Sequence, residues 1–336
     1  MAVAPQGFSP KEFKCAVVSD ATNAGSTGIG STMYQLDVDS VSYPSLNLNQ
    51  VLDVRSGAGR TFKDEDFFQD NVLRTVELSL SGTLHNDAGH KLLLQNICND
   101  VSGDIAVATG FTPASQAYGA AVTNNASSLT VVIQPSDVSH QRGLEFFGCV
   151  VTNFSISADM GTEGGRYKWS ATLQTGKKPD LNSTETPTIT AYANNTHSLM
   201  SSASGLKVMN NDVTMNSFTC TLDNPAVFSG VTSTGYEVVN RGAEMAVTVD
   251  TQVKYDNNTK TLMTAYDTQG VTPDTAAIIS AGNSFVMTNN NAFGIAIDNA
   301  VYTNVAYSEG DIMMLDISLK SFDDGSDALV TFDVSA

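Results

Sequence analysis

Basic side chains are scarce in this 336-residue sequence, and their scarcity argues against binding to nucleic acid. The 17 Lys and Arg residues stand against 35 Asp and Glu residues, which gives a formal net charge of −18. The sequence contains no segment rich in Lys and Arg. The chain should therefore repel the phosphates of DNA and of anionic membranes, although DNA could slide past such a surface without being captured.

Long apolar runs and closely spaced cysteines are also lacking. No stretch approaches the roughly 18 apolar residues that identify a membrane-spanning helix. The first residues lack the basic and then apolar order of a secretion signal. The cysteines lie far apart, without the short spacings of zinc sites or disulfide scaffolds; they are Cys15, Cys98, Cys149 and Cys220. We expect a protein made in a cytoplasm, with buried reduced thiols and no membrane association.

Turn-forming and β-branched residues are abundant instead. Charged residues make up only 15% of the chain, well below the usual quarter, and Asn, Ser, Thr, Gly and Asp take their place. Apolar and polar residues alternate, as in strands, over 34–41, 76–84, 153–158 and 166–175. A glycine-rich turn over 160–165 should join the last two strands into a hairpin.

Helical patterns are few. Residues 89–100 contain a short apolar run typical of a helix, and residues 274–282 fit either a helical turn or a strand. The predicted fold class is all-β, with one or two short helices.

Short blocks of sequence recur in the same order in the two halves. The matched blocks are Arg74–Ser81 with Arg241–Thr248, Lys91-Leu92 with Lys260-Thr-Leu262, Val151–Phe154 with Tyr302–Val305, and Pro44–Leu46 with Asn216–Phe218. A collinear series of this kind indicates a duplicated β module, the alternative being two unrelated β domains. A Pro-, Ser- and Thr-rich linker over 177–187 predicts modules at 1–180 and 181–336. Only the first contains a long polar loop, Ala108–Ser128.

Residue groups that could support chemistry all have simpler interpretations. His85 and His90 lie near Asp87 and could form part of a metal site, but their spacing favours a solvated hairpin turn. The remaining histidines, His140 and His197, are expected at the surface. The segment Asp323–Asp327 resembles part of a calcium loop without its further ligands, which favours a tight turn.

No catalytic arrangement emerges from the sequence. The glycines over 25–30 lack the order of a phosphate-binding loop and suggest a flexible arm. Paired carboxylates are plentiful enough for a glycosidase, but a sugar-binding cleft usually contains several tryptophans, and Trp169 is the only one. We expect no enzyme activity, no cofactor and no metal.

Several segments resemble the tail tube (major tail) proteins of bacteriophages with long, non-contractile tails. They are residues 148–176 in the first half and residues 217–224, 235–249, 299–304 and 307–318 in the second. The resemblance implies two tandem β-sandwich or half-barrel modules, each with a flanking helix. It further implies that six modules close a ring around a β-barrel and that rings stack into a tube. A chain with two modules would then form trimeric, pseudo-hexameric rings.

The same resemblance implies a structural virion protein, located in the tail tube, through which genome DNA is ejected. Tail terminator, tail tip and tape measure proteins would be its partners. An N-terminal arm over about residues 1–30 and the loop Ala108–Ser128 would reach the adjacent ring. Acids on expected strands are candidates to face the lumen; they are Asp37, Asp39, Glu77, Glu244 and Asp316.

Two other classes of function remain open on the sequence alone. One is a different β-rich phage protein, such as a capsid decoration protein or a fibre or adhesin. The other is a carbohydrate-binding or hydrolytic β-sandwich. Self-assembly into rings or tubes would favour the tube subunit, whereas a surface platform of aromatic residues would favour the carbohydrate-binding protein.

Overall fold

A computed structural model describes most of the chain and confirms the all-β fold class, with 63% of the described residues in strands and 9% in helices. The described residues are 10–20, 32–43, 50–52, 67–69, 75–98, 128–135, 141–192, 198–232, 235–241, 244–263, 279–289, 293–322 and 329–333. The predicted helix over 89–100 is observed as α1, Ala88–Ile97. No helix in these ranges is long and apolar enough to cross a membrane.

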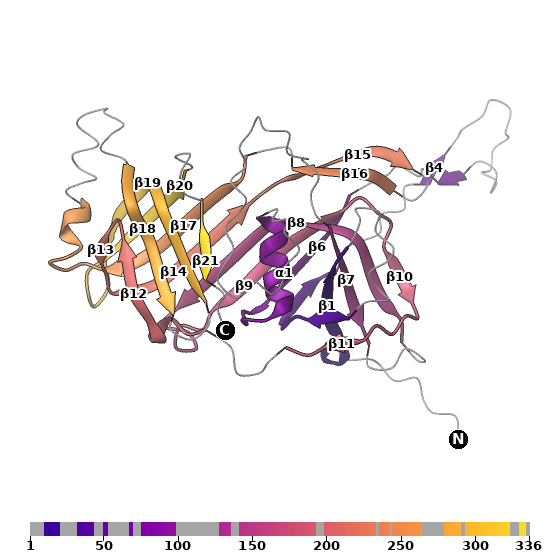
Figure 1. The fold of residues 1–336 in the computed structure, drawn as a ribbon, viewed down its shortest axis with the longest axis horizontal. Helices are drawn as coiled ribbons and strands as arrows, with labels where there is room; N and C mark the ends of the chain where they lie inside the picture. Colours follow the sequence, from indigo (N-terminus) through magenta and orange to yellow (C-terminus); the bar gives the residue numbers. More distant parts are fainter. Residues whose placement is uncertain are drawn as a thin grey trace, which may run out of the picture.

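Most strands of the first half lie around α1, whereas β4 lies at the far end of the molecule (Figure 1). The strands of this half are β1 Lys14–Ser19, β2 Met33–Gln35, β3 Ser40–Ser42, β4 Gln50–Leu52, β5 Phe67–Gln69, β6 Val76–Thr83, β7 Leu129–Gln134, β8 Gly143–Asp159, β9 Lys168–Thr175, β10 Asp180–Ser183 and β11 Ile189–Thr190. The expected hairpin is confirmed: β8 and β9 pair antiparallel, with Phe154 opposite Ala171.

Most described residues of the second half lie in strands. Its strands are β12 Ala203–Val208, β13 Asn211–Asp212, β14 Met215–Asp223, β15 Ala226–Thr232, β16 Gly235–Arg241, β17 Ala246–Lys254, β18 Ile279–Asn289, β19 Gly294–Ser308, β20 Met314–Ser321 and β21 Thr331–Asp333. Short 3-10 helices lie at Pro10–Glu12 and Met200–Ser202. A helical turn spans 260–263.

One sheet runs through both halves. Its strands pair in the order β3, β6, β9, β8, β14, β17, β20 and β19. The halves join where β14 pairs antiparallel with β8, from Ser217 opposite Asp159 to Asp223 opposite Asn153. Figure 1 shows this junction at the middle of the molecule, between the magenta and orange strands.

The order of pairing in the first half recurs in the second. As β6 pairs with β9 and β9 with β8, so β17 pairs with β20 and β20 with β19. The two long strands β8 and β19 also correspond to each other. The N-terminal part of β8 pairs with β7 and β10, and the N-terminal part of β19 pairs with β18 and β21. A two-stranded hairpin precedes β6 and another precedes β17, namely β4–β5 and β15–β16.

A β-bulge occurs at the same place in both long strands. The register between β8 and β9 shifts at Thr152, and the register between β19 and β20 shifts at Thr303. These threonines occupy the same position in the matched blocks Val151–Phe154 and Tyr302–Val305. Since an extra residue bends a strand and alters its twist, the two strands bend at matched points. The division into modules at 1–180 and 181–336 stays a prediction, because the sheet is continuous.

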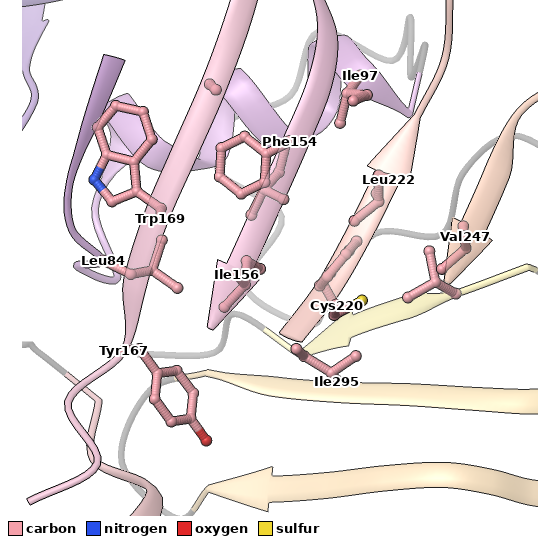
Figure 2. Close-up of a cluster of buried hydrophobic side chains, with 14 of the residues drawn as sticks. Leu84, Ile97, Phe154, Ile156, Tyr167, Trp169, Cys220, Leu222, Val247 and Ile295 are labelled. Carbon is pink, nitrogen blue, oxygen red and sulfur yellow. The ribbon is translucent and has the colours of Figure 1, made fainter. Parts of the chain in front are cut away.

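The hydrophobic core also crosses from one half to the other. Figure 2 shows Phe154 and Ile156 of β8 beside Cys220 and Leu222 of β14, and all four side chains are buried in one cluster. Tyr167 of the first half also contacts the second half, because its hydroxyl donates a hydrogen bond to the sulfur of Met287, 2.9 Å away. Separate cores for the two halves are therefore not observed among the described residues.

The expectation of reduced, buried cysteines is confirmed. None of the four cysteines forms a disulfide, and all four are buried. Burial raises the pKa of Cys15 and of Cys220 to about 12, which keeps these thiols protonated and unreactive near neutral pH.

Three expectations about the chain path are wrong in part. The strand expected over 34–41 divides into β2 and β3, because the chain turns inward at Leu36, which is buried. Residues 14–19 are not an arm but form β1, which pairs with β7. The supposed linker contains β10, which pairs with β8.

Gly82 is required where the chain crosses β6. A Cβ atom built there would lie 1.9 Å from the carbonyl oxygen of Asp37, an overlap that only backbone movement could relieve. We expect Gly82→Ala to lower the free energy of unfolding by about 3 kcal/mol, measured by chemical denaturation. The control is Gly310→Ala, where the nearest atom is 3.6 Å away. Equal stability of the two variants would contradict this packing.

Glu145 provides a test of pH dependence at the pairing of β8 with β10. Burial raises the pKa of its carboxyl group, the hydrogen bond from Ser183 opposes the rise, and the charges of Asp180 and Glu185 add to it. Because the folded-state pKa is raised, the contribution of Glu145 to stability is complete below the unfolded pKa, near 4.5, and is lost as pH rises through the folded pKa.

We therefore expect Glu145→Gln to gain stability relative to the unsubstituted protein as pH rises from 4 to 7. The gain should be about 1.4 kcal/mol for each unit by which the pKa is raised. Urea denaturation of both proteins across this range measures it. A stability difference that stays constant with pH would show that burial does not penalise this carboxylate.

Candidate functional surface

One face of the continuous sheet is covered with short polar side chains. Residues alternate along the strands, so that apolar side chains enter the core and polar ones face outward. The uncharged outward residues include Ser79, Ser81, Ser170, Thr172, Ser155, Ser157, Ser217, Thr219, Thr221, Thr248 and Ser318. We call this surface the polar face. Registered pairing places its side chains in rows, such as Ser157, Thr219 and Asp250 across three strands.

The polar face also carries acids and bases, among them Asp223, Lys254 and Lys320. Neighbouring polar groups hold two of its carboxylates. Ser318 donates a hydrogen bond to Asp250 at 2.6 Å. Gln252 donates to Asp316 at 2.8 Å, and it accepts a hydrogen bond from Asn216 at 2.7 Å. These contacts fix the carboxylates in rows of hydroxyls and amides. The face is hydrophilic and weakly acidic, without a cluster of bases to retain a polyanion.

Two hollows lie on the polar face near the junction of the halves. One has a volume of about 240 Å³ and is lined by residues of β14, β17 and β20, including Asp250 and Asp316. The other, of about 420 Å³, extends from β8 and β14 to the turn around Glu163. Both are lined largely by polar side chains, in contrast to the mostly apolar pockets that usually hold small molecules.

Two of the candidate lumen acids lie on the polar face. Glu77 is exposed on β6 and accepts a hydrogen bond from Gln174 at 3.3 Å. Asp316 lies on β20, as described above. Whether these acids face a lumen stays a prediction, because it depends on assembly.

The other three candidate acids lie off the strands on which they were expected. Asp39 precedes β3 and accepts a hydrogen bond from Lys168 at 3.3 Å, while Glu244 is exposed just before β17. Asp37 lies between β2 and β3, where the chain has turned inward, and it contacts His85.

The expected solvated turn around His85 and His90 is wrong. The side chains of both histidines are at most 3% exposed, because the chain passes from β6 under the sheet into α1. His85 is 2.8 Å from Asp37, and His90 is 2.8 Å from Asp87, whose side chain also caps α1. The hydrogen bond to His85 lowers the pKa of the Asp37 carboxyl group.

The histidines pack and form hydrogen bonds within the structure. The ring of His90 packs edge-on against Trp169, with centroids 5.2 Å apart. No group of three or more His, Cys, Asp or Glu residues placed to hold a metal occurs in the described part of the chain. Other candidates, namely His140, His197, Asp323–Asp327 and the glycines over 25–30, lie outside the described residues, as does most of the loop Ala108–Ser128.

A buried arginine forms hydrogen bonds to both halves at their junction. Arg241, at the end of β16, donates hydrogen bonds to the carbonyl oxygens of Asn96, Val151 and Asn224 at 2.8, 2.8 and 2.5 Å. These oxygens belong to the last turn of α1, to the bulge of β8 and to the residue after β14. Burial lowers the pKa of the guanidinium to about 10, so Arg241 remains charged at neutral pH.

In the sequence, Arg241 stands out only as the first residue of a repeated block. Its burial could not be read from that block, because its partners come from three segments distant in sequence. The negative end of the α1 dipole favours a cation at this place. Arg241 thereby ties the β15–β16 hairpin of the second half to the helix of the first.

Comparison with known proteins gives no independent assignment. No protein-family model matches the chain, and no curated protein matches it significantly.

Proposed function

We propose that this chain is a structural subunit that polymerises as stacked rings into a tube, as in the tail of a non-contractile-tailed bacteriophage. Three copies would form each pseudo-hexameric ring, and the polar face would line the channel. DNA would pass through during genome ejection. Terminator, tip and tape measure proteins would be its partners in the virion, after synthesis in the host cytoplasm.

The repeated order of strand pairing is the observation that carries this proposal. Matched bulges at Thr152 and Thr303 bend both long strands at corresponding points, so further copies of the chain could extend the sheet by the same step that joins the halves. If the rotation between successive copies closes after three chains, the sheet forms a ring and its free edges become paired.

The polar face supports the role of a channel wall. Its rows of Ser and Thr hydroxyls are well hydrated, and its few carboxylates repel phosphate. Trp169 is buried, so among the described residues no tryptophan is available on this face for sugar stacking. An enzyme is not proposed.

Electron micrographs of the purified protein in negative stain test the proposal. We expect rings of uniform diameter that stack into hollow tubes as the protein concentration rises. The rings should show threefold or sixfold symmetry when averaged. A protein that stays monomeric at high concentration, by light scattering and by microscopy, would refute the tube assignment.

A further inference from the structure

Among the described residues, the strand order that runs through both halves ends in β3 on one side and in the last part of β19 on the other. β3 pairs with β6 along one edge only. The last part of β19, from Asn304 to Ser308, pairs with β20 along one edge only. Unpaired backbone N–H and C=O groups on such edges readily accept another strand. The sheet junction inside the chain indicates which strand that would be.

The internal junction serves as a template for a contact between two copies. Within one chain, β14 lies beside β17 and adds antiparallel to the end of β8. In the first half, β3 lies beside β6 as β14 lies beside β17. In the second half, the end of β19 lies beside β20 as the end of β8 lies beside β9. The same step between chains would therefore join β3 of one copy to β19 of the next.

The bulges and the matched blocks give the register of this contact on both strands. On β19, the bulge at Thr303 corresponds to the bulge at Thr152, so Asn304 corresponds to Asn153. On β3, the residue that corresponds to Asp223 of β14 is found through the neighbouring strand β6. Ser42 is opposite Ser79 of β6, just as Asp223 is opposite Ala246 of β17, and Ser79 and Ala246 share one place in the matched blocks Arg74–Ser81 and Arg241–Thr248.

Because Asp223 is opposite Asn153 at the internal junction, Ser42 of one copy should be opposite Asn304 of the next. The same register places Val41 opposite Val305. Val305 is buried on the core side and Val41 packs partly against the core, whereas Ser42 and Asn304 are exposed on the opposite side. Both faces of the sheet would thus continue unbroken from one copy to the next.

We propose that β3 of one copy pairs antiparallel with the end of β19 of a second copy, with Ser42 opposite Asn304. This inference rests on the proposed function, since it supplies the contact that closes a ring. The aromatic side chains that flank the two edges, Tyr43 and Tyr307, are 49% and 48% exposed. Pairing would cover apolar surface that the isolated chain leaves in water.

The hairpins give independent support. β15–β16 lies along the first half. The rings of Phe228 and Tyr236 are so close to Gly176 that a Cβ atom added there would lie within 2.8 Å of both. Val239 packs on Val150. The corresponding hairpin of the first half, β4–β5, lies at the periphery of the molecule, beyond the tip of β15–β16, in Figure 1. By the same step, β4–β5 would lie along the second half of the neighbouring copy.

Disulfide crosslinking tests the register directly. We would co-express Ser42→Cys chains with Asn304→Cys chains and oxidise the assembled protein. Residues directly opposite in an antiparallel pair have Cα atoms about 4.5–5.5 Å apart, within the range of a disulfide. The native cysteines are all buried and form no disulfide, so they should not interfere. The control co-expresses Ser42→Cys with Ser308→Cys, about 13 Å out of register.

We expect covalent dimers on a non-reducing gel from the matched pair, and few from the control pair or from either variant alone. If tubes form but the matched pair yields no more dimer than the control, the proposed contact is overturned while the tube function stands. If matched dimers form in a protein that assembles neither rings nor tubes, the contact is supported and the tube function fails.

Discussion

Arg241→Met should destabilise the protein by about 3–5 kcal/mol, the largest effect we expect from any single substitution. The guanidinium is 6% exposed and donates to three backbone carbonyl groups. Met preserves most of the aliphatic volume but none of the donors. The carbonyl oxygens of Asn96, Val151 and Asn224 would lose their hydrogen bonds to Arg241 in a buried site, at about 1–3 kcal/mol for each group left unsatisfied.

Arg166→Met is the matched control for this substitution. Arg166 is 34% exposed and forms an ion pair of 3.5 Å with Glu163, a surface contact worth about 1 kcal/mol or less. Denaturant titration, followed by circular dichroism, measures both variants. Similar losses for Arg166→Met and Arg241→Met would contradict the role given to Arg241. Arg241→Lys should fall between them, because an ammonium group keeps the charge but not the planar fork of donors.

Local sequence patterns predicted the elements whose contacts are close in sequence. The alternation over 153–158 and 166–175, with its glycine-rich turn, predicted the hairpin of β8 and β9, because both strands bury one face and the connection is short. The apolar run Leu92–Leu94 predicted α1 for a similar reason. The wide spacing of the cysteines predicted reduced thiols without disulfides.

Features that depend on distant segments were not predictable. The histidines were expected in water because nothing near them in sequence shows that α1 packs under the sheet. β10 was taken for linker because its composition is polar, yet a strand at the margin of a sheet needs little apolar surface. The candidate acids Asp37 and Asp39 were assigned to a strand that the inward turn at Leu36 interrupts.

The matched blocks were informative because they record position in the sheet, not side-chain chemistry. Val151–Phe154 and Tyr302–Val305 share only a Thr-Asn pair at their centre, and that pair lies at the bulge of each long strand. The block Pro44–Leu46 cannot be assigned a position in the sheet, since it lies outside the described residues. Strand pairing instead relates Ser40–Ser42 to the end of β14.

Neither half should fold alone, and this is the second large effect we expect. A break between residues 195 and 196 would separate β11 from β12 without cutting any of the described strands. It would remove the seven-residue pairing of β14 with β8 and expose both sides of the core there, including Phe154, Ile156 and Leu222. Each such side chain contributes about 1.5–3 kcal/mol when buried, and a domain is stable by only about 5–15 kcal/mol.

Fragments 1–195 and 196–336, expressed separately, should therefore lack a cooperative thermal transition and fixed near-ultraviolet dichroism. The full chain should unfold in a single transition, because one sheet and one core connect its halves. Co-expression of the two fragments is the control: a complex with the dichroism of the full chain would show that the break itself is tolerated. Independent cooperative unfolding of each fragment would instead make the halves autonomous modules, with the β8–β14 junction reduced to a docking contact.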